Sequence, residues 1–456
     1  MLAMNHFSLF FTQRIARVIG TSWLIHTRVV SPKISMLSKK IFLLIFVLGS
    51  LAGCGAGHVG SHDSIGKHQS AIIVVPGYYG TRLVRNSDEH LVWISASEAL
   101  FGDQPLTLPV QGLGLTQAID LRPDGILDHV PVIPYLYEVD VYGALIDELR
   151  SKTHGDATVI PFTYDWRRDL LDSVKQLDAR VQQIRKDGIR DITLVAHSLG
   201  GLIVSYYLRY GTQEIASAVE TWEGVAQVST VVMAGVPFLG VMNSLRNMNY
   251  GVTVKLNTSL LTAEAYSSFP SSYYTLPLFE TDRLMTPNLD VRNNVIRNPE
   301  SWKQSGWGLL NNTQNVSPHI IARRTEYTTL WLHRSKRFLA LLRAPLERAA
   351  PRQVQLFYIS AKGSPTLAKG IWLDHYGQGP DSLYFDNVDP ERFQVTIDPA
   401  ILYDDGDETV TVRSAWLPAA YRDAFQTTVQ EYEVSHTELV THPQVLDDIV
   451  LFLNAP

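Results

Sequence analysis

A serine between small residues marks the stretch Val195–Gly201, which reads VAHSLGG. The apolar run Ile192–Ala196 predicts a buried strand, and the residues after the serine predict a helix. Ala196, Ser198 and Gly200 then form a G-x-S-x-G-like elbow, in which small neighbours permit the sharp turn that exposes a serine hydroxyl. At a helix N-terminus, free N–H groups and the helix dipole favour developing negative charge. The stretch predicts a nucleophilic serine; the alternative is a turn whose serine merely caps the helix.

A serine hydroxyl is a poor nucleophile unless a base takes its proton, so a histidine and an orienting acid are needed. His436 directly follows a predicted strand, and His442 precedes the last predicted helix. His197, next to Ser198, is expected to point away from the hydroxyl. The segment YDDGDETVTVRS supplies the candidate acids Asp404, Asp405, Asp407 and Glu408. Nucleophile, acid and histidine thus occur in the chain order of an α/β-hydrolase.

The acidic segment has other readings. Its carboxylates are also suited to calcium, although their spacing is not that of an EF-hand loop, or they form a solvated turn. We therefore expect no metal and no cofactor.

Buried strands alternate with amphipathic helices from Ala71 onward, which predicts a mostly parallel sheet with helices on both faces. Strands are expected within 71–77, 157–166, 191–197, 228–240, 354–363 and 427–436. Helices are expected within 137–155, 169–188, 202–211 and 443–454. The alternation is interrupted between Gly240 and Arg352, so residues of about 241–352 are predicted to form an inserted cap on a domain that spans 71–456.

Residues 1–53 are predicted to be a leader. They hold six basic residues and no acidic one, and Lys39 and Lys40 precede an apolar run, Ile41–Leu48, that is too short to span a bilayer. We expect residues 1–35 to lie upstream of the true start at Met36. Residues 54–70, rich in Gly, Ser and His, are predicted to be a flexible tether.

The end of the leader, Leu51–Cys54, resembles a bacterial lipobox, which implies cleavage before Cys54 and lipidation of its thiol. The expected location is the bacterial cell envelope, at the outer membrane if the cell is Gram-negative. The alternatives are a plain signal peptide, or a membrane helix formed with upstream apolar residues. Because Cys54 is the only cysteine, an intramolecular disulfide is excluded.

Charge argues against nucleic acid as a partner. The leader holds six of the 39 basic residues and none of the 45 acidic ones, so the remaining chain has a formal charge of −12. A chain with this balance lacks the basic character that binding to phosphate backbones requires.

Seven motifs in order resemble those of the lecithin:cholesterol acyltransferase family. They are VVPGYYGTRL, FTYDWRRD, VAHSLGG, GVPFLG, FPSSYYTLP, DGDETV and SHTELVTHPQVLDDI, and the resemblance runs from about Ala71 to Leu453. It implies an α/β-hydrolase that forms an acyl-enzyme on Ser198, with His436 as base and Asp407 as the orienting acid. It also implies oxyanion donors at the backbone N–H groups of Tyr78 and Leu199.

The YDWR segment supplies further candidate residues. Tyr79, Asp165 and Trp166 are candidates for lining the substrate pocket, and Asp165 is also expected to pair with Arg167 to hold the loop. A direct chemical role for Asp165 is the alternative, although family triads place the acid after a later strand.

Within the predicted cap, the segment 309–350 mixes leucines with Arg323, Arg324, Arg334, Lys336 and Arg337. This composition suits either a basic helix at an anionic lipid surface or, as we expect, a cap helix packed on the hydrolase body. Either arrangement would shape access of an acyl chain.

The chain departs from the family in Ala196, in Glu408 and in lacking the cysteines of animal relatives, so the substrate does not follow from the resemblance. We expect a lipid-ester hydrolase or acyltransferase acting on phospholipid or glycerolipid. The alternatives are a small-ester carboxylesterase or thioesterase with the same triad, and a non-catalytic binding module of the envelope.

Overall fold

The computed structural model describes residues 70–115, 117–133, 137–153, 157–255, 257–278, 283–311, 313–373, 382–385 and 397–455. The predicted leader, Cys54 and nearly all of the predicted tether lie outside the described residues, so these remain predictions. Within the described ranges, no helix is long and apolar enough to cross a membrane.

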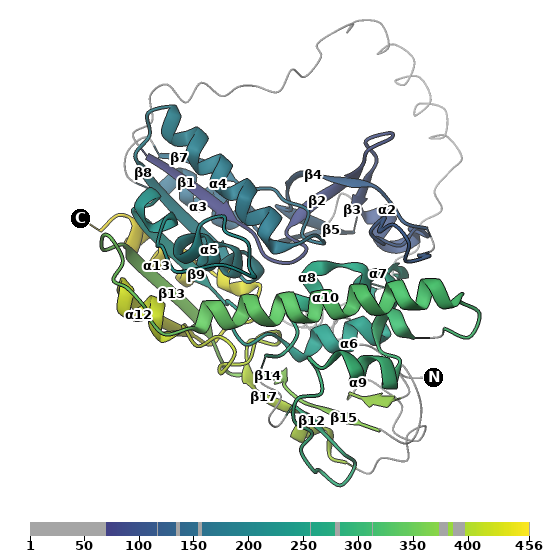
Figure 1. Ribbon diagram of the computed structural model, residues 1–456. Coiled ribbons are helices and arrows are strands. Elements are labelled where there is room, and N and C mark those ends of the chain that lie inside the picture. The colour runs from purple at the N-terminus through teal and green to yellow at the C-terminus, as the bar shows by residue number, and fades with distance from the viewer. Residues whose placement is uncertain are drawn as a thin grey trace, which may run out of the picture. The chain divides into compact units, whose positions relative to one another are not determined.

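A six-stranded sheet forms the centre of the domain (Figure 1). Every neighbouring pair of its strands is parallel, as the alternation of strands and helices predicts. The order across the sheet is β18-β13-β9-β8-β1-β7. The strands are β1 (Ser70–Val75), β7 (Ala157–Pro161), β8 (Asp191–His197), β9 (Thr230–Ala234), β13 (Gln355–Ala361) and β18 (Gln426–Tyr432).

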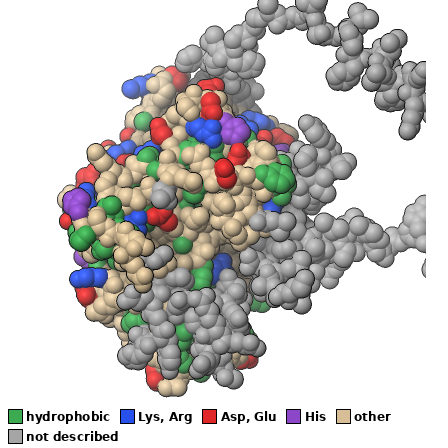
Figure 2. Space-filling view, turned by 90° about the vertical axis from the view of Figure 1, so that its right-hand side faces the viewer, with side chains coloured by type: hydrophobic (Ala, Val, Ile, Leu, Met, Phe, Trp, Pro, Cys, Tyr) green, Lys and Arg blue, Asp and Glu red, His purple; other side chains and the backbone are tan. Residues whose placement is uncertain are grey.

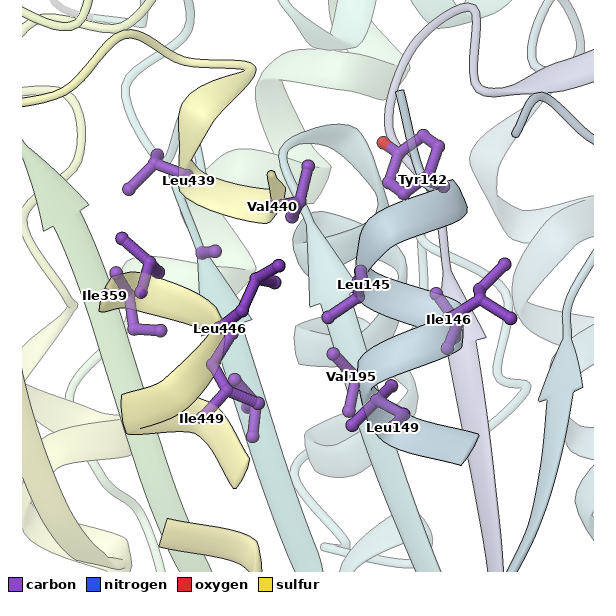
Figure 3. Packing of buried hydrophobic residues seen from close by; sticks show 14 of the residues in the cluster. Tyr142, Leu145, Ile146, Leu149, Val195, Ile359, Leu439, Val440, Leu446 and Ile449 are labelled. Carbon is purple, nitrogen blue, oxygen red and sulfur yellow. The ribbon is translucent and has the colours of Figure 1, made fainter. Parts of the chain in front are cut away.

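Helices cover both faces of this sheet. On one face, α3 (Gly143–Lys152) and α13 (Pro443–Leu453) pack against the strands, and Figure 3 shows Leu145 and Leu446 directed toward Val195 and Ile359. Side chains alternate along a strand, so Leu194 and Ala196 of β8 face the opposite side. That side is covered by α4 (Leu170–Lys186) and α5 (Leu199–Tyr210), which contact each other.

The structure corrects two predicted boundaries. The helix expected over 137–155 begins only at Gly143, because Tyr137–Asp140 forms strand β6 and pairs with β5 (His129–Ile133). Strand β7 ends at Pro161, so Tyr164, Asp165 and Trp166 lie in the turn beyond it. In both cases the apolar pattern continues past the point where the backbone pairing changes.

Three excursions leave the sheet. The first, between β1 and α3, contains β2 (Thr81–Arg85), β3 (Leu91–Trp93), α2 (Ala96–Phe101), β4 (Leu121–Ile126), β5 and β6. The second lies between β9 and β13, where the cap is predicted. It contains α6 (Met242–Tyr250), β10 (Val252–Val254), β11 (Asn257–Leu261), α7 (Ala263–Ser268), α8 (Pro270–Tyr274), β12 (Leu284–Met285), α9 (Pro299–Ser305) and α10 (Pro318–Arg343).

The third excursion lies between β13 and β18. It contains β14 (Ser364–Leu367), β15 (Gly370–Trp372), β16 (Leu383–Tyr384), β17 (Tyr403–Gly406) and α12 (Ala419–Ala424). Strand β17 pairs with β14, and the chain that follows it carries Asp407. This excursion therefore delivers an acidic side chain back to the sheet.

Helix α10 joins the second excursion to the hydrolase body (Figure 1). It contacts α8 and α9, and it also contacts α5, where the Phe338 ring stacks on Tyr206 with centroids 4.8 Å apart. Its buried side chains include Leu332, Leu339 and Leu342. The helix is packed on the body along this stripe, as expected for a cap helix.

Charged side chains of both signs are interspersed on the face that Figure 2 shows.

Candidate active site

Ser198 occupies a strained turn between β8 and α5. Its φ is 55° and its ψ is −123°, in a region that a residue with a Cβ rarely adopts. The turn closes because its neighbours are glycines: a Cβ at Gly200 would lie 2.3 Å from the Val75 carbonyl oxygen, and one at Gly201 2.2 Å from a Val236 methyl carbon. The sequence-predicted elbow is present, with the serine at the N-terminus of α5.

The structure brings Ser198, His436 and Asp407 together. Nε2 of His436 lies 2.9 Å from Oγ of Ser198, and Nδ1 of the same ring lies 2.7 Å from Oδ2 of Asp407. The backbone repeats the link, since the His436 N–H donates to the Asp407 carbonyl at 2.9 Å. The Ser198 and His436 positions are 238 residues apart in sequence.

The Asp407 carboxylate is buried and fully occupied. Its side chain is 1% exposed, and its Oδ1 accepts the N–H groups of Thr409 at 3.0 Å and Val410 at 2.6 Å. With Oδ1 held by the turn, Oδ2 is left to face the imidazole. An acid fixed in this way selects the ring orientation and stabilises an imidazolium when one forms.

The other candidate acids point elsewhere. Asp404 pairs with Lys369 at 3.0 Å, and Oδ1 of Asp405 accepts the Gly363 N–H at 2.6 Å. Glu408 follows Asp407 with a left-handed φ of 77°, and its pKa is raised by burial and by the nearby charges of Glu438 and Asp407. Among the described residues, no group of three or more His, Cys, Asp and Glu side chains is arranged to hold a metal ion.

The candidate base His442 is not joined to the serine. It occupies the N-cap position of α13, and within the described residues its Nδ1 has no hydrogen-bond partner. Of the two histidines that sequence reasoning weighed, only His436 reaches Ser198.

The expected oxyanion donors belong to the residues that follow Gly77 and Ser198. Gly77, in the turn after β1, approaches so closely that a Cβ there would lie 2.7 Å from the Ser198 Cβ. Tyr78 follows it, and Leu199 follows the serine. Within the described part of the chain, neither the Tyr78 nor the Leu199 backbone N–H donates to another group. Both N–H groups are therefore unpaired among the described residues, and their role as oxyanion donors stays a prediction.

Cap and hydrolase body meet at Tyr78. Its hydroxyl lies 2.8 Å from Ser272 Oγ and accepts from Ser271 Oγ at 3.2 Å, and both serines belong to α8. The Tyr78 ring also stacks on Tyr266 of α7, with centroids 5.8 Å apart. The second excursion therefore holds the residue whose backbone N–H is an expected oxyanion donor.

Tyr79 and Trp166 share an aromatic cluster with Tyr78. The Trp166 ring contacts both tyrosine rings, with centroid distances of 5.3 Å to Tyr78 and 4.9 Å to Tyr79, and it also contacts Trp93 and Phe269. Trp166 is fully buried, and its Nε1 donates to the Thr81 carbonyl at 3.1 Å. In this structure the Trp166 ring packs against the chain that follows the turn after β1. We call this turn, which holds Gly77 and Tyr78, the oxyanion turn.

Asp165 is paired with Arg167, as the structural reading expects. Oδ1 accepts from Arg167 Nε at 2.9 Å and Oδ2 from Arg167 Nη2 at 2.8 Å, while Arg168 Nε adds a contact of 3.1 Å. Burial acts to raise the pKa of Asp165, but the charge and hydrogen bonds of Arg167 hold it below its ordinary value. Both oxygens are occupied, so Asp165 does not line a pocket through its carboxylate.

Sequence reasoning missed three supporting residues. The Tyr164 hydroxyl donates to the Pro76 carbonyl at 2.7 Å, and the Tyr142 hydroxyl accepts the Gly77 N–H at 2.7 Å, so two phenols clamp the oxyanion turn. Gly235, with a φ of 62°, lies beneath His436; a Cβ there would be 3.0 Å from the ring. Tyr164 and Gly235 stand inside the YDWR and GVPFLG motifs, whereas nothing in the sequence signals Tyr142.

The parallel sheet, the strained serine elbow after β8 and the histidine after β18 define an α/β-hydrolase. Residues 115–317, less than half of the chain, match the family model described as lecithin:cholesterol acyltransferase. The search of curated proteins gave no significant match.

Solved structures that resemble the chain include three of low sequence identity. A chain of the Tle4–Tli4 complex is 13% identical, with a TM-score of 0.48 over 84% of this chain and 98% of that one. A Bacillus licheniformis lipase is 12% identical (TM-score 0.31, 87% and 95% covered), and a Staphylococcus hyicus lipase is 11% identical (TM-score 0.34, 85% and 93% covered).

Proposed function

We propose that the protein is a serine acyl hydrolase or acyltransferase that acts on phospholipid or glycerolipid esters through an acyl-enzyme on Ser198. One observation carries the proposal: the two nitrogens of His436 contact Ser198 Oγ at 2.9 Å and Asp407 Oδ2 at 2.7 Å. A carboxylate at Nδ1 requires the proton on that nitrogen. Nε2 of His436 then carries a lone pair that can accept the proton of the Ser198 hydroxyl.

The reaction follows from these contacts. Oγ of Ser198 attacks the ester carbonyl carbon while its proton moves to Nε2 of His436. The carbonyl oxygen becomes an oxyanion and accepts from the N–H groups of Tyr78 and Leu199, each donor of this kind contributing about 3 kcal/mol to the transition state. The C–O bond of the leaving alcohol then breaks, and that alcohol takes the proton from Nε2.

The acyl-enzyme is resolved by a second hydroxyl group. Water or an acceptor alcohol attacks the acyl carbonyl and gives its proton to Nε2, and Oγ of Ser198 recovers that proton as the bond breaks. Water yields a fatty acid, whereas an alcohol yields a new ester. The same triad serves both outcomes.

Labelling with a fluorophosphonate tests the nucleophile. We expect the wild-type protein and Ser205→Ala to label, because Ser205 lies one helical turn or more from the elbow in α5. Ser198→Ala should not label, and His436→Ala should lose labelling while His442→Ala keeps it. A folded wild-type protein that does not label would favour the non-catalytic binding module.

Chain-length preference tests the substrate class. We expect long-chain phospholipid or glycerolipid in vesicles to be cleaved with a higher kcat/KM than short-chain p-nitrophenyl esters, with Ser198→Ala as the blank for each. The reverse preference would favour a small-ester carboxylesterase or thioesterase. Adding an acceptor alcohol and analysing the products by mass spectrometry separates transfer from hydrolysis.

We also propose that the chain is exported and anchored in a bacterial envelope by a lipid on Cys54. The support is the sequence: a basic and apolar leader that ends in the lipobox-like Leu51–Cys54. Expression with a radiolabelled fatty acid should label the membrane fraction, and Cys54→Ser should abolish the label and release the protein. Membrane association that persists in Cys54→Ser would contradict the anchor.

A further inference from the structure

His197 lies between two parts of the candidate site. Its Nδ1 is 2.8 Å from the Tyr142 hydroxyl, and its Nε2 is 3.1 Å from the His436 carbonyl oxygen. The Tyr142 hydroxyl in turn accepts the Gly77 N–H at 2.7 Å. A continuous chain of hydrogen bonds therefore links Gly77 in the oxyanion turn, through Tyr142 and His197, to the backbone of His436. We call this chain the relay.

Tyr142 is fixed by its own element. It is the N-cap residue of α3, is 2% exposed, and lies beyond Leu145 on the side of the carboxyl ends of the strands (Figure 3). Its ring packs edge-on to His197, with centroids 5.8 Å apart. A hydroxyl held in this way has little freedom to seek another partner.

The donors and acceptors fit one arrangement only. Since the Tyr142 oxygen already accepts from Gly77, its own hydrogen is free to donate to Nδ1 of His197. Nδ1 of His197 must then carry a lone pair, which places the ring proton on Nε2. That proton meets the His436 carbonyl, which can only accept.

The surroundings keep the His197 ring neutral. Burial lowers its pKa well below the ordinary value, and the adjacent His436 lowers it further. The two imidazole rings lie 4.7 Å apart, so a charge on His197 would oppose the positive charge that His436 acquires during proton transfer.

We infer that Tyr142 and His197 are positioning residues that couple the oxyanion turn to the loop carrying His436. Gly77 immediately precedes Tyr78, whose N–H is a proposed oxyanion donor, and the His436 carbonyl belongs to the proposed base itself. Through this relay the two loops share one set of hydrogen bonds. The inference rests on the proposed function, because it assigns both loops a role in one reaction.

Tyr142→Phe tests the relay with Tyr206→Phe as the matched control. Both remove the hydroxyl of a buried tyrosine, and Tyr206 donates to the Gln213 carbonyl in a separate part of the body. We expect Tyr142→Phe to lower kcat about tenfold with KM changed less than about twofold, and Tyr206→Phe to leave both unchanged. An unchanged kcat in Tyr142→Phe, or an equal fall in the control, would overturn the inference.

A double-mutant cycle tests the coupling. If Tyr142 and His197 act as one unit, Tyr142→Phe combined with His197→Gln should lower kcat about as much as the more damaging single change. Multiplication of the two effects, to about a hundredfold if each is tenfold, would show independent residues and contradict the relay. His197→Asn, whose amide oxygen can accept near the Nδ1 position, should retain more kcat than His197→Leu.

Nitrogen NMR of imidazole-labelled protein gives a readout that needs no activity. We expect His197, assigned by comparison with His197→Gln, to show a protonated Nε2 and an unprotonated Nδ1 at neutral pH. The opposite tautomer or a charged ring would overturn the relay even in an active enzyme. Conversely, the wild-type protein could show the expected tautomer and yet fail to react with a fluorophosphonate. The tautomer would then support the relay, and the failure to react would refute the proposed function.

Discussion

Two loops at the carboxyl side of the sheet each bury an aspartate, and they use it differently. In the loop after β7, Asp165 faces Arg167, a partner whose charge is permanent. In the loop after β17, Asp407 faces His436, a partner that gains its charge only when it takes a proton.

The two aspartates differ in whether their partners, Arg167 and His436, have other groups to contact. Arg167 is fully buried and also donates to the Leu106 carbonyl at 2.9 Å, so its ion pair with Asp165 ties together segments of the fold. His436 retains a nitrogen 2.9 Å from a hydroxyl and is 13% exposed. Similar burial of a carboxylate therefore supports a structural clamp in one loop and the proposed proton-transfer site in the other.

Asp407→Asn should produce the largest effect on activity. An amide at this position can hold the wrong imidazole tautomer, so we expect kcat to fall by about 10⁴-fold with a small change in stability. Steady-state kinetics with an ester substrate and thermal unfolding measure the two quantities. A loss of less than about tenfold would place the orienting acid elsewhere in the DGDETV segment.

Asp165→Asn should show the opposite pattern. Removing one charge leaves Arg167 buried and unpaired, so we expect the free energy of unfolding to fall by about 3 kcal/mol. The folded fraction should retain most of its fluorophosphonate labelling. Normal stability together with lost labelling would assign Asp165 a chemical role and erase the contrast between the loops.

Ser198→Gly tests whether the turn at Ser198 is strained. Glycine adopts the φ and ψ of this turn without penalty, so the inactive variant should be more stable than the wild type by about 1 kcal/mol. Ser205→Gly, inside α5, should instead be less stable by about 1 kcal/mol. Denaturant unfolding distinguishes them, and a destabilised Ser198→Gly would contradict strain at the elbow.

The pH dependence of stability reports on the neutral His197. Its pKa is lowered in the folded state, so below about pH 6.5 the unfolded chain binds more protons at this residue and the free energy of unfolding falls. His197→Gln should flatten that fall. Equal slopes in the wild type and His197→Gln would show that the ring is not held neutral.

Asp404→Asn should have the smallest effect. Its ion pair with Lys369 is partly exposed, so we expect stability to change by less than about 1 kcal/mol and kcat to stay the same. This variant is the charge-matched control for Asp407→Asn. A large loss of kcat would revive Asp404 as the orienting acid.

The candidate triad residues were easier to predict from the sequence than the residues that hold them in place. Ser198, Asp407 and His436 carry short motifs in a fixed order, and a buried run before the serine predicts its strand. The sequence alone left four acids and two histidines open, because which carboxylate faces the ring depends on turn geometry such as the hydrogen bonds from Thr409 and Val410 to Asp407. Local pattern does not encode that choice; the family resemblance resolved it.

Long-range contacts account for most of what sequence reasoning missed. Tyr142 reaches Gly77 across 65 residues and His197 across 55, and no periodicity in the sequence records either contact. The apolar pattern around Val141 likewise extended a predicted helix into β6, because pairing with β5 overrides local preference there. The acyl pocket and the substrate stay predictions.

The position of β18 at one edge of the sheet has a consequence for synthesis. The nucleophile follows β8 near the middle of the sheet, while its acid and base arrive only with residues 407 and 436. A nascent or proteolysed chain that ends before those positions carries a serine with no group to take its proton. Under the proposed function, such fragments should not label with a fluorophosphonate, so reactivity of Ser198 is withheld until the far edge strand has been added.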